Sequence, residues 1–151
     1  MLLPIFISLL FSIGKSSVQN KEESLRPVSF SKNLTAIQSE EGLLLLKKNC
    51  YACHNPNTSS HDEIIAPPLH GIKEHYLKAY PSRETFSEAM ASFVGNPIAE
   101  KALMKGPVKR FGLMPKPAVS EEDLQKIIAY IQDNKLETPS WWADHKMGGH
   151  E

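Results

Sequence analysis

Two cysteines and a histidine are the residues of this 151-residue chain with the clearest capacity for chemistry. Cys50 and Cys53 are the only cysteines, and His54 follows directly in the run Cys-Tyr-Ala-Cys-His. In a tight turn, two thiols at this spacing can react with two groups of one bound molecule, while the adjoining imidazole can bind a metal ion. With two cysteines in all, a scaffold held together by several disulfides is excluded.

The Cys-x-x-Cys-His pattern is typical of covalent attachment of a c-type haem, in which each thiol adds to one vinyl group and the histidine binds the iron. Three other interpretations stay open at this point. A zinc site needs further ligands at paired spacing, and the chain has no third cysteine. A thioredoxin-like dithiol requires a βαβ context that the sequence does not indicate. A pair present by chance would tend to form a disulfide in an oxidising compartment.

The chain begins with an apolar segment that precedes the predicted domain. Residues 2–13 form a 12-residue apolar run followed by small residues, although no Lys or Arg precedes the run. This length suits the core of a signal peptide and falls short of the roughly 18 apolar residues of a membrane-spanning helix. We therefore predict a signal peptide over residues 1–17 and a periplasmic location; the alternative is a buried N-terminal helix of the domain.

The remaining chain divides into three parts by composition. Residues 18–38 are polar with little periodicity and predict an extended linker. Residues 39–136 form the predicted folded domain. Residues 137–151 are irregular and predict a flexible C-terminal tail, although they hold side chains that suggest a metal or partner site as an alternative, namely Trp141, Trp142, His145, Met147 and His150.

Charge and composition exclude some functions. The chain has 17 Lys and Arg residues and 17 Asp and Glu residues, so it has no net basic field of the kind that binds nucleic acid. With 41% hydrophobic residues it can form a packed core. We expect a small domain that has no nucleic-acid partner and contacts a membrane only through partner complexes.

The apolar residues of the domain recur at helical spacing. From Leu124 to Ile131 they fall at i, i+3, i+4 and i+7, which is typical of an amphipathic helix. No alternating run is long enough for a sheet, so the predicted fold class is all-α. The expected helices are, in order, one capped by Ser39, one over about 72–80, one capped by Ser82, a short one over 98–104 and one capped by Ser120.

Further motifs accompany the cysteine motif at informative separations. They are Gly42 and Leu46, eight and four residues before Cys50; the segment 66–71 (Ala-Pro-Pro-Leu-His-Gly); the segment 111–115 (Phe-Gly-Leu-Met-Pro); and the pair Tyr130 and Ile131 in the last helix. With them, residues 39–136 resemble the small monohaem class I cytochromes c of the exported bacterial type. The resemblance implies a cytochrome c-like fold, with several helices around one covalently attached haem c and its iron.

The resemblance also implies a role for each site residue. Cys50 and Cys53 form the thioethers, His54 is the proximal iron ligand and Met114 is the distal one. The carbonyl of Pro67 accepts a hydrogen bond from the second ring nitrogen of His54, which orients the ring. A soft methionine thioether favours ferrous iron and raises the reduction potential. Other residues could take the distal position instead, namely Met104, Met90, His61, His70 and His75.

These features predict a periplasmic electron carrier rather than an enzyme, with redox partner proteins that supply and accept one electron. Two alternatives stay open: a haem enzyme or gas sensor with an open sixth position, and a cytochrome subunit of a larger respiratory complex. A basic run without acidic residues is either a docking surface for an acidic redox partner or an ordinary solvated face; it comprises Lys101, Lys105, Lys109, Arg110 and Lys116.

Overall fold

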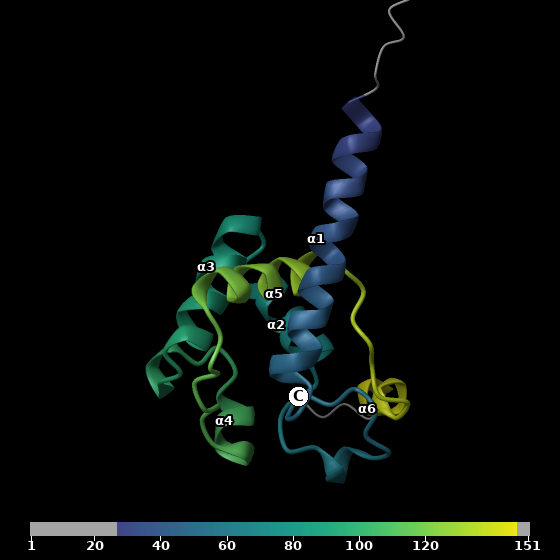
Figure 1. The fold of residues 1–151 in the computed structure, drawn as a ribbon. Coiled ribbons are helices and arrows are strands. Elements are labelled where there is room, and N and C mark those ends of the chain that lie inside the picture. Colours follow the sequence, from purple (N-terminus) through teal and green to yellow (C-terminus); the bar gives the residue numbers. More distant parts are fainter. Residues whose placement is uncertain (1–26, 148–151) are drawn as a thin grey trace, which may run out of the picture.

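The computed structural model of the chain describes residues 27–147. All regular structure in this part is helical and no strand occurs in it, which confirms the all-α prediction (Figure 1). The elements are α1 (Pro27–Cys50), the 3₁₀ helix η1 (His61–Glu63), α2 (Leu69–Ala79), α3 (Arg83–Gly95), the 3₁₀ helix η2 (Ala99–Lys101), α4 (Lys105–Phe111), α5 (Glu121–Asp133) and α6 (Trp142–Met147).

The first and fifth helices cross closely near the middle of the molecule (Figure 1). Gly42 makes this approach possible, because a Cβ atom at this position would lie 2.8 Å from both the carbonyl oxygen of Lys126 and the Cβ of Tyr130. Lys126 also donates to Glu41 across the crossing, at 2.8 Å. The predicted contact between the two helices is therefore present, and it holds the end of α1 in a defined position.

The hydrophobic core lies between α1, α3 and α5. Leu46, Phe86 and Ile128, one from each of these helices, are fully buried. The amphipathic pattern predicted for α5 matches its buried face, since the residues at i, i+3, i+4 and i+7, which are Leu124, Ile127, Ile128 and Ile131, are all buried. Burial of such side chains contributes about 1.5–3 kcal/mol each, which makes this the main source of stability within the protein part.

The start of two helices follows from capping serines. Ser82 accepts a hydrogen bond from the backbone N–H of Thr85, and Ser120 accepts one from that of Asp123. Both helices therefore begin where the sequence predicts. The helix expected over 98–104 is instead the single turn η2, and a helix that the sequence analysis did not include, α4, begins at Lys105.

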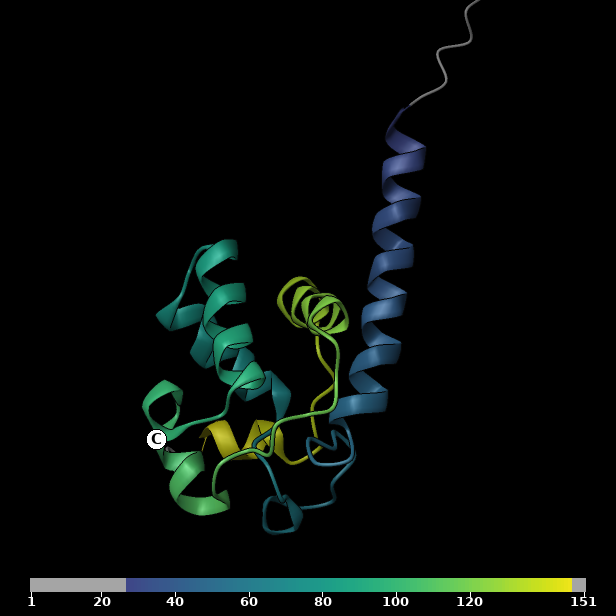
Figure 2. The ribbon, with the colours of Figure 1, turned by 60° about the vertical axis from the view of Figure 1, so that its left-hand side comes forward.

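The two ends of the described chain differ from the sequence-based expectation. The extended linker predicted over 18–38 is helical from Pro27 onward (Figure 2). Since α1 runs without a break through Ser39, this serine is not the cap of the helix. Proline is favoured at the first position of a helix, because its missing N–H would have no partner there. The predicted signal peptide, residues 1–17, lies outside the described residues.

The C-terminal segment also differs from the flexible tail predicted over 137–151. Residues 142–147 form α6, and the segment before it packs against the domain: Pro139 is buried, and the Nε1 of Trp141 donates to the Oγ1 of Thr58 at 3.3 Å. Three of the side chains behind the metal-site alternative for the tail, those of His145, Met147 and His150, lie outside what the structure describes. None of the described helices is both long and apolar enough to cross a membrane.

Candidate functional site

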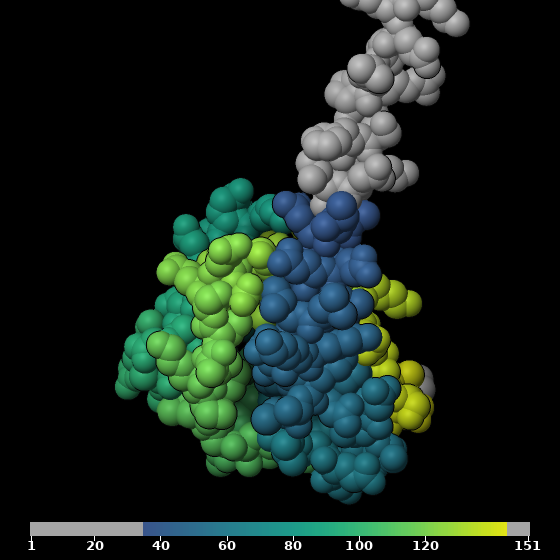
Figure 3. All heavy atoms as spheres, viewed as in Figure 1, coloured from purple at the N-terminus to yellow at the C-terminus, as the bar shows by residue number. Residues whose placement is uncertain are grey.

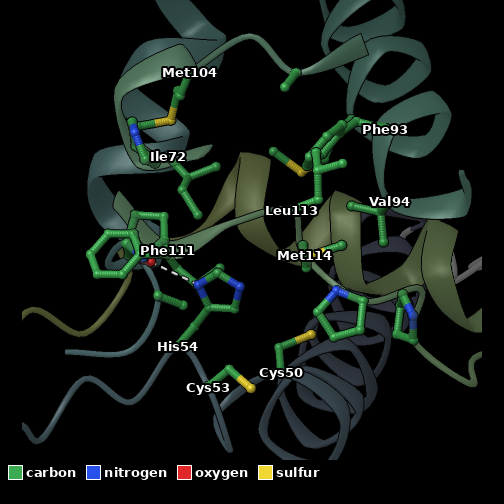
Figure 4. A pocket seen from close by; sticks show the side chains of 18 of the residues that line it. Cys50, Cys53, His54, Ile72, Phe93, Val94, Met104, Phe111, Leu113 and Met114 are labelled. Atoms are coloured by element: carbon green, nitrogen blue, oxygen red, sulfur yellow. Dashed lines mark hydrogen bonds between the residues drawn. The ribbon is translucent and has the colours of Figure 1, made fainter. Parts of the chain in front are cut away.

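The cysteine motif begins where α1 ends. Cys50 is the last residue of the helix, and its carbonyl oxygen accepts hydrogen bonds from the N–H groups of Cys53 and His54, at 3.2 and 2.9 Å. This turn presents the three side chains toward the same pocket (Figure 4). Both thiols are free, with Cys50 half-buried and Cys53 exposed.

The Cys50 thiol lacks one property of a redox-active dithiol. Burial, and then the neighbouring Cys53, raise the pKa of the Cys50 thiol to about 11. Dithiols that exchange disulfides depend instead on a lowered thiol pKa. Cys50 therefore does not match the thioredoxin-like alternative.

The His54 ring is held by the backbone of a proline. Its Nδ1 lies 2.7 Å from the carbonyl oxygen of Pro67, which is the hydrogen bond that the sequence resemblance implies (Figure 4). Since a carbonyl only accepts, Nδ1 carries the proton and Nε2 keeps a free lone pair. Burial lowers the pKa of His54, against a smaller opposing effect of this hydrogen bond, so the ring stays neutral at pH 7. A neutral, oriented imidazole is the form that binds iron.

A cavity of about 290 Å³ opens beside His54. Its walls come from α2, α3, α4 and α5, and they are almost entirely apolar. They include Ile72, Met90, Phe93, Val94, Leu124 and Ile128. The cysteine turn and the segment after α4 lie side by side on the face of the molecule shown in Figure 3.

The segment from Gly112 to Pro117 forms the other wall, across from the cysteine motif (Figure 4). Gly112 ends α4 with φ of 82°, a left-handed conformation that favours glycine, and so turns the chain toward the cavity. Met114 follows two residues later and is half-buried in the cavity wall, while Leu113 is 44% exposed at its edge.

The structure separates the candidates for the distal ligand. Met104 and Met90 line the cavity together with Met114, although Met90 is only 3% exposed within the core. The histidines are directed elsewhere. His70 interacts with Glu74 at 3.2 Å and His61 lies 2.8 Å from a guanidinium nitrogen of Arg110. His75 is exposed on α2 and does not line the cavity.

Arg110 belongs to the basic run and connects the two sides of the site. Its Nη2 donates to the carbonyl oxygen of His61 at 3.2 Å, which joins α4 to η1. The other basic residues of the run are exposed, namely Lys101, Lys105, Lys109 and Lys116. Lys116 lines the cavity itself, and the other three are next in the chain to the lining residues Ala102, Met104 and Val108.

The donor set fits a haem. The cavity offers a neutral imidazole nitrogen, a thioether sulfur on the far side, two free thiols at its edge and apolar walls for a flat macrocycle. Sequence reasoning found these residues, but it missed the contact of the C-terminal Trp142 with Gly71, which joins α6 to α2. Only the two adjacent tryptophans in a polar tail could have indicated it.

The comparisons with known proteins agree with this geometry. The family model described as Cytochrome c matches residues 39–135, which is more than half of the chain. No curated protein and no solved structure gave a match. The chain therefore belongs to the cytochrome c family, whose members are electron carriers that bind haem c covalently.

Proposed function

We propose that this chain is an exported electron carrier that transfers one electron at a time through its haem c. In this proposal Cys50 and Cys53 form the thioether bonds, and His54 and Met114 are the axial ligands of the iron. The bound haem supplies the iron whose oxidation state changes between ferric and ferrous. The protein holds the ligands in place, so that little reorganisation accompanies the change.

The orientation of His54 is the observation that carries the proposal. Its Nδ1 proton is donated to the Pro67 carbonyl at 2.7 Å, so Nε2 is the nitrogen left to bind iron. An imidazole fixed in this way cannot rotate out of position when the charge of the iron changes. A hydrogen bond from Nδ1 also makes the ring a better electron donor to the metal.

Met114 supports a closed sixth position. It lies in the cavity wall across from the cysteine motif, in a segment held by the turn at Gly112 and by two prolines, Pro115 and Pro117. A thioether ligand favours the ferrous state and raises the potential. With this position filled, a gas or a substrate has no free site on the iron.

The cavity also offers few groups for acid–base chemistry. Enzymatic proton transfer needs a positioned acid or base close to the reacting atoms. Among the described residues that line the cavity, the polar side chains are Asn49, Cys50, Cys53, His54, Tyr76 and Lys116. Once the proposed attachment and ligand roles are assigned, Asn49, Tyr76 and Lys116 remain. Burial raises the pKa of Tyr76 to about 12, far from neutral pH, which supports electron transfer rather than catalysis.

Absorption spectra of the oxidised and reduced protein, with and without carbon monoxide, test the proposal. We expect a low-spin c-type haem whose reduced form does not bind carbon monoxide. Replacing Met114 with Ala should remove the thioether-to-ferric-iron band in the far red, allow carbon monoxide to bind and lower the potential. A haem-stained band in the periplasmic fraction tests export.

Met104→Ala is the matched control, because Met104 also lines the cavity. It should leave the band in place. If the band survives in Met114→Ala and disappears in Met104→Ala, the assignment of the ligand is wrong. Carbon monoxide binding to the unaltered protein would support a haem enzyme or gas sensor instead.

A further inference from the structure

The C-terminal segment is an addition to the cytochrome c core. The family match ends at residue 135, whereas the chain continues along the domain to α6. We call residues 136–142 the C-terminal strap. Leu136, at its start, is 4% exposed within the core, and the strap then places α6 beside the loop that follows α1 (Figures 1 and 2).

Trp142 at the end of the strap contacts the first turn of α2. A Cβ atom at Gly71 would lie 2.7 Å from Cη2 of the indole, which shows how closely the ring approaches the backbone of this glycine. The ring also meets the imidazole of His70 edge-on, with centroids 5.8 Å apart and an interplanar angle of 84°. Gly71 therefore leaves the space that the indole occupies.

The turn under Trp142 begins immediately after Pro67. Pro68 is the residue that precedes α2, and its carbonyl accepts from the N–H of Ile72 at 3.1 Å. Prolines have no N–H, so neither Pro67 nor Pro68 can be held by a backbone hydrogen bond that it donates. Their position therefore depends on the hydrogen bonds that their carbonyls accept and on packing, to which the turn that follows them contributes.

The end of α5 makes a second tie to the same helix. The Nζ of Lys73 donates to the carbonyl oxygen of Asn134 at 2.7 Å, and Lys73 is two residues beyond Gly71 in α2. The strap starts two residues after Asn134. The first half of α2 is therefore fixed at two points by the segment that leads into and through the strap.

We propose that Trp142 is a positioning residue for the iron ligand. By resting on Gly71 it fixes the first turn of α2, and it thereby keeps the Pro67 carbonyl within hydrogen-bond distance of the His54 Nδ1. This inference rests on the proposed function, since it assumes that His54 binds the iron. Without Trp142 this hydrogen bond weakens, the imidazole donates less electron density and the ferric state loses stabilisation.

Two measurements on the haem-loaded, full-length protein test this role. In Trp142→Ala we expect the midpoint potential to rise and the His54 Nδ1 proton of the ferrous protein, followed by NMR, to exchange several-fold faster. Trp141→Ala is the matched control, because the contact with Gly71 belongs to Trp142, whereas Trp141 contacts Thr58 and the η1 residue His61. The two indole rings also meet, with centroids 6.0 Å apart, so the control removes the neighbour of Trp142 without removing Trp142 itself. It should leave both quantities close to those of the unaltered protein.

Gly71→Ala tests the contact from its other side and serves if Trp142→Ala does not fold. The three atoms nearest to the added methyl all belong to Trp142, at 2.7–3.6 Å. Gly71→Ala should therefore shift potential and exchange in the same direction as Trp142→Ala. In the Trp142→Ala background the methyl has room, so adding Gly71→Ala should produce no further shift.

The outcomes distinguish this inference from the function on which it depends. A spectrum of the unaltered protein without haem, or without histidine ligation, would contradict the proposed function before any variant is made. Given a normal spectrum, a Trp142→Ala protein that is less stable but keeps its potential and proton exchange would overturn the positioning role. So would equal shifts in Trp141→Ala and Trp142→Ala, because they would indicate a general loosening of the C-terminal segment.

Discussion

Gly42 is the residue on which the approach of α1 to α5 depends. A methyl group here would meet the Lys126 carbonyl oxygen and the Tyr130 Cβ at 2.8 Å, and neither atom belongs to the flexible end of a side chain. We expect Gly42→Ala to lower the free energy of unfolding by about 1–3 kcal/mol, because the helices must move apart. Denaturant unfolding of the haem-loaded protein measures this change.

Gly106→Ala is the control for this substitution. Gly106 lies in α4, and a Cβ there would meet no atom within 4 Å. Since alanine is a better helix former than glycine, this change should be neutral or should stabilise the protein by up to about 1 kcal/mol. Equal losses at both positions would show that the helix crossing does not depend on the absent side chain.

At the scale of the element, α5 depends on the cap at its start. Ser120 Oγ accepts from the N–H of Asp123 at 3.1 Å, and the acidic residues of the first turn face the positive end of the helix dipole. Ser120→Ala should lower the free energy of unfolding by about 1 kcal/mol. Ser120→Asp should lower it much less, because aspartate can also accept the capping hydrogen bond. Thermal unfolding of the two variants compares them, and equal losses would contradict a capping role.

The whole molecule depends on haem to complete its core. A cavity of about 290 Å³ left empty would cost up to about 7 kcal/mol, which is comparable with the total stability of a small domain. The double substitution Cys50→Ala and Cys53→Ala should therefore give a largely unfolded, protease-sensitive protein.

Limited proteolysis and far-ultraviolet circular dichroism measure this loss. The exposed Ala52 offers a control, since Ala52→Ser changes the same turn but keeps both thiols. That variant should bind haem and resist protease. A compact double variant that unfolds cooperatively without haem would contradict the dependence.

The distribution of charge also acts at the scale of the molecule. Without residues 1–17 the chain has 16 basic and 17 acidic residues, so steering of a partner must come from local charge rather than from the total. The exposed basic residues beside the cavity predict an acidic partner surface. We expect electron transfer to such a partner to slow as salt rises, because screening acts over about 10 Å at 0.1 M.

Replacing Lys105 and Lys109 with Glu should lower the association rate in stopped-flow measurements without changing the haem spectrum. The same change of charge at Lys78 and Lys135, which do not border the cavity, is the control and should have a smaller effect. A rate that responds to neither salt nor the first pair would indicate an apolar contact, for which the exposed Leu113 and Ile65 at the cavity edge are suited.

The features that could be predicted from the sequence depend on local chemistry. The cysteine motif, the serine caps of α3 and α5 and the apolar face of α5 each depend on residues within a few positions of one another, so their spacing is enough to predict them. The all-α class followed from the same short-range periodicity. Even the hydrogen bond between His54 and Pro67 could be expected, because the family resemblance supplied the partner.

Contacts between residues far apart in the chain could be known only from the folded structure. Trp142 meets Gly71 across 71 positions, and no local pattern in an irregular polar tail encodes that contact. The extension of α1 back to Pro27 also runs against the polar composition of its first turns, and residues 35–38 within it are exposed. The contact of Trp142 with Gly71 arises from packing, which generally contributes more to the stability of such elements than local propensity does. Packing is known only once the distant surfaces have been brought together.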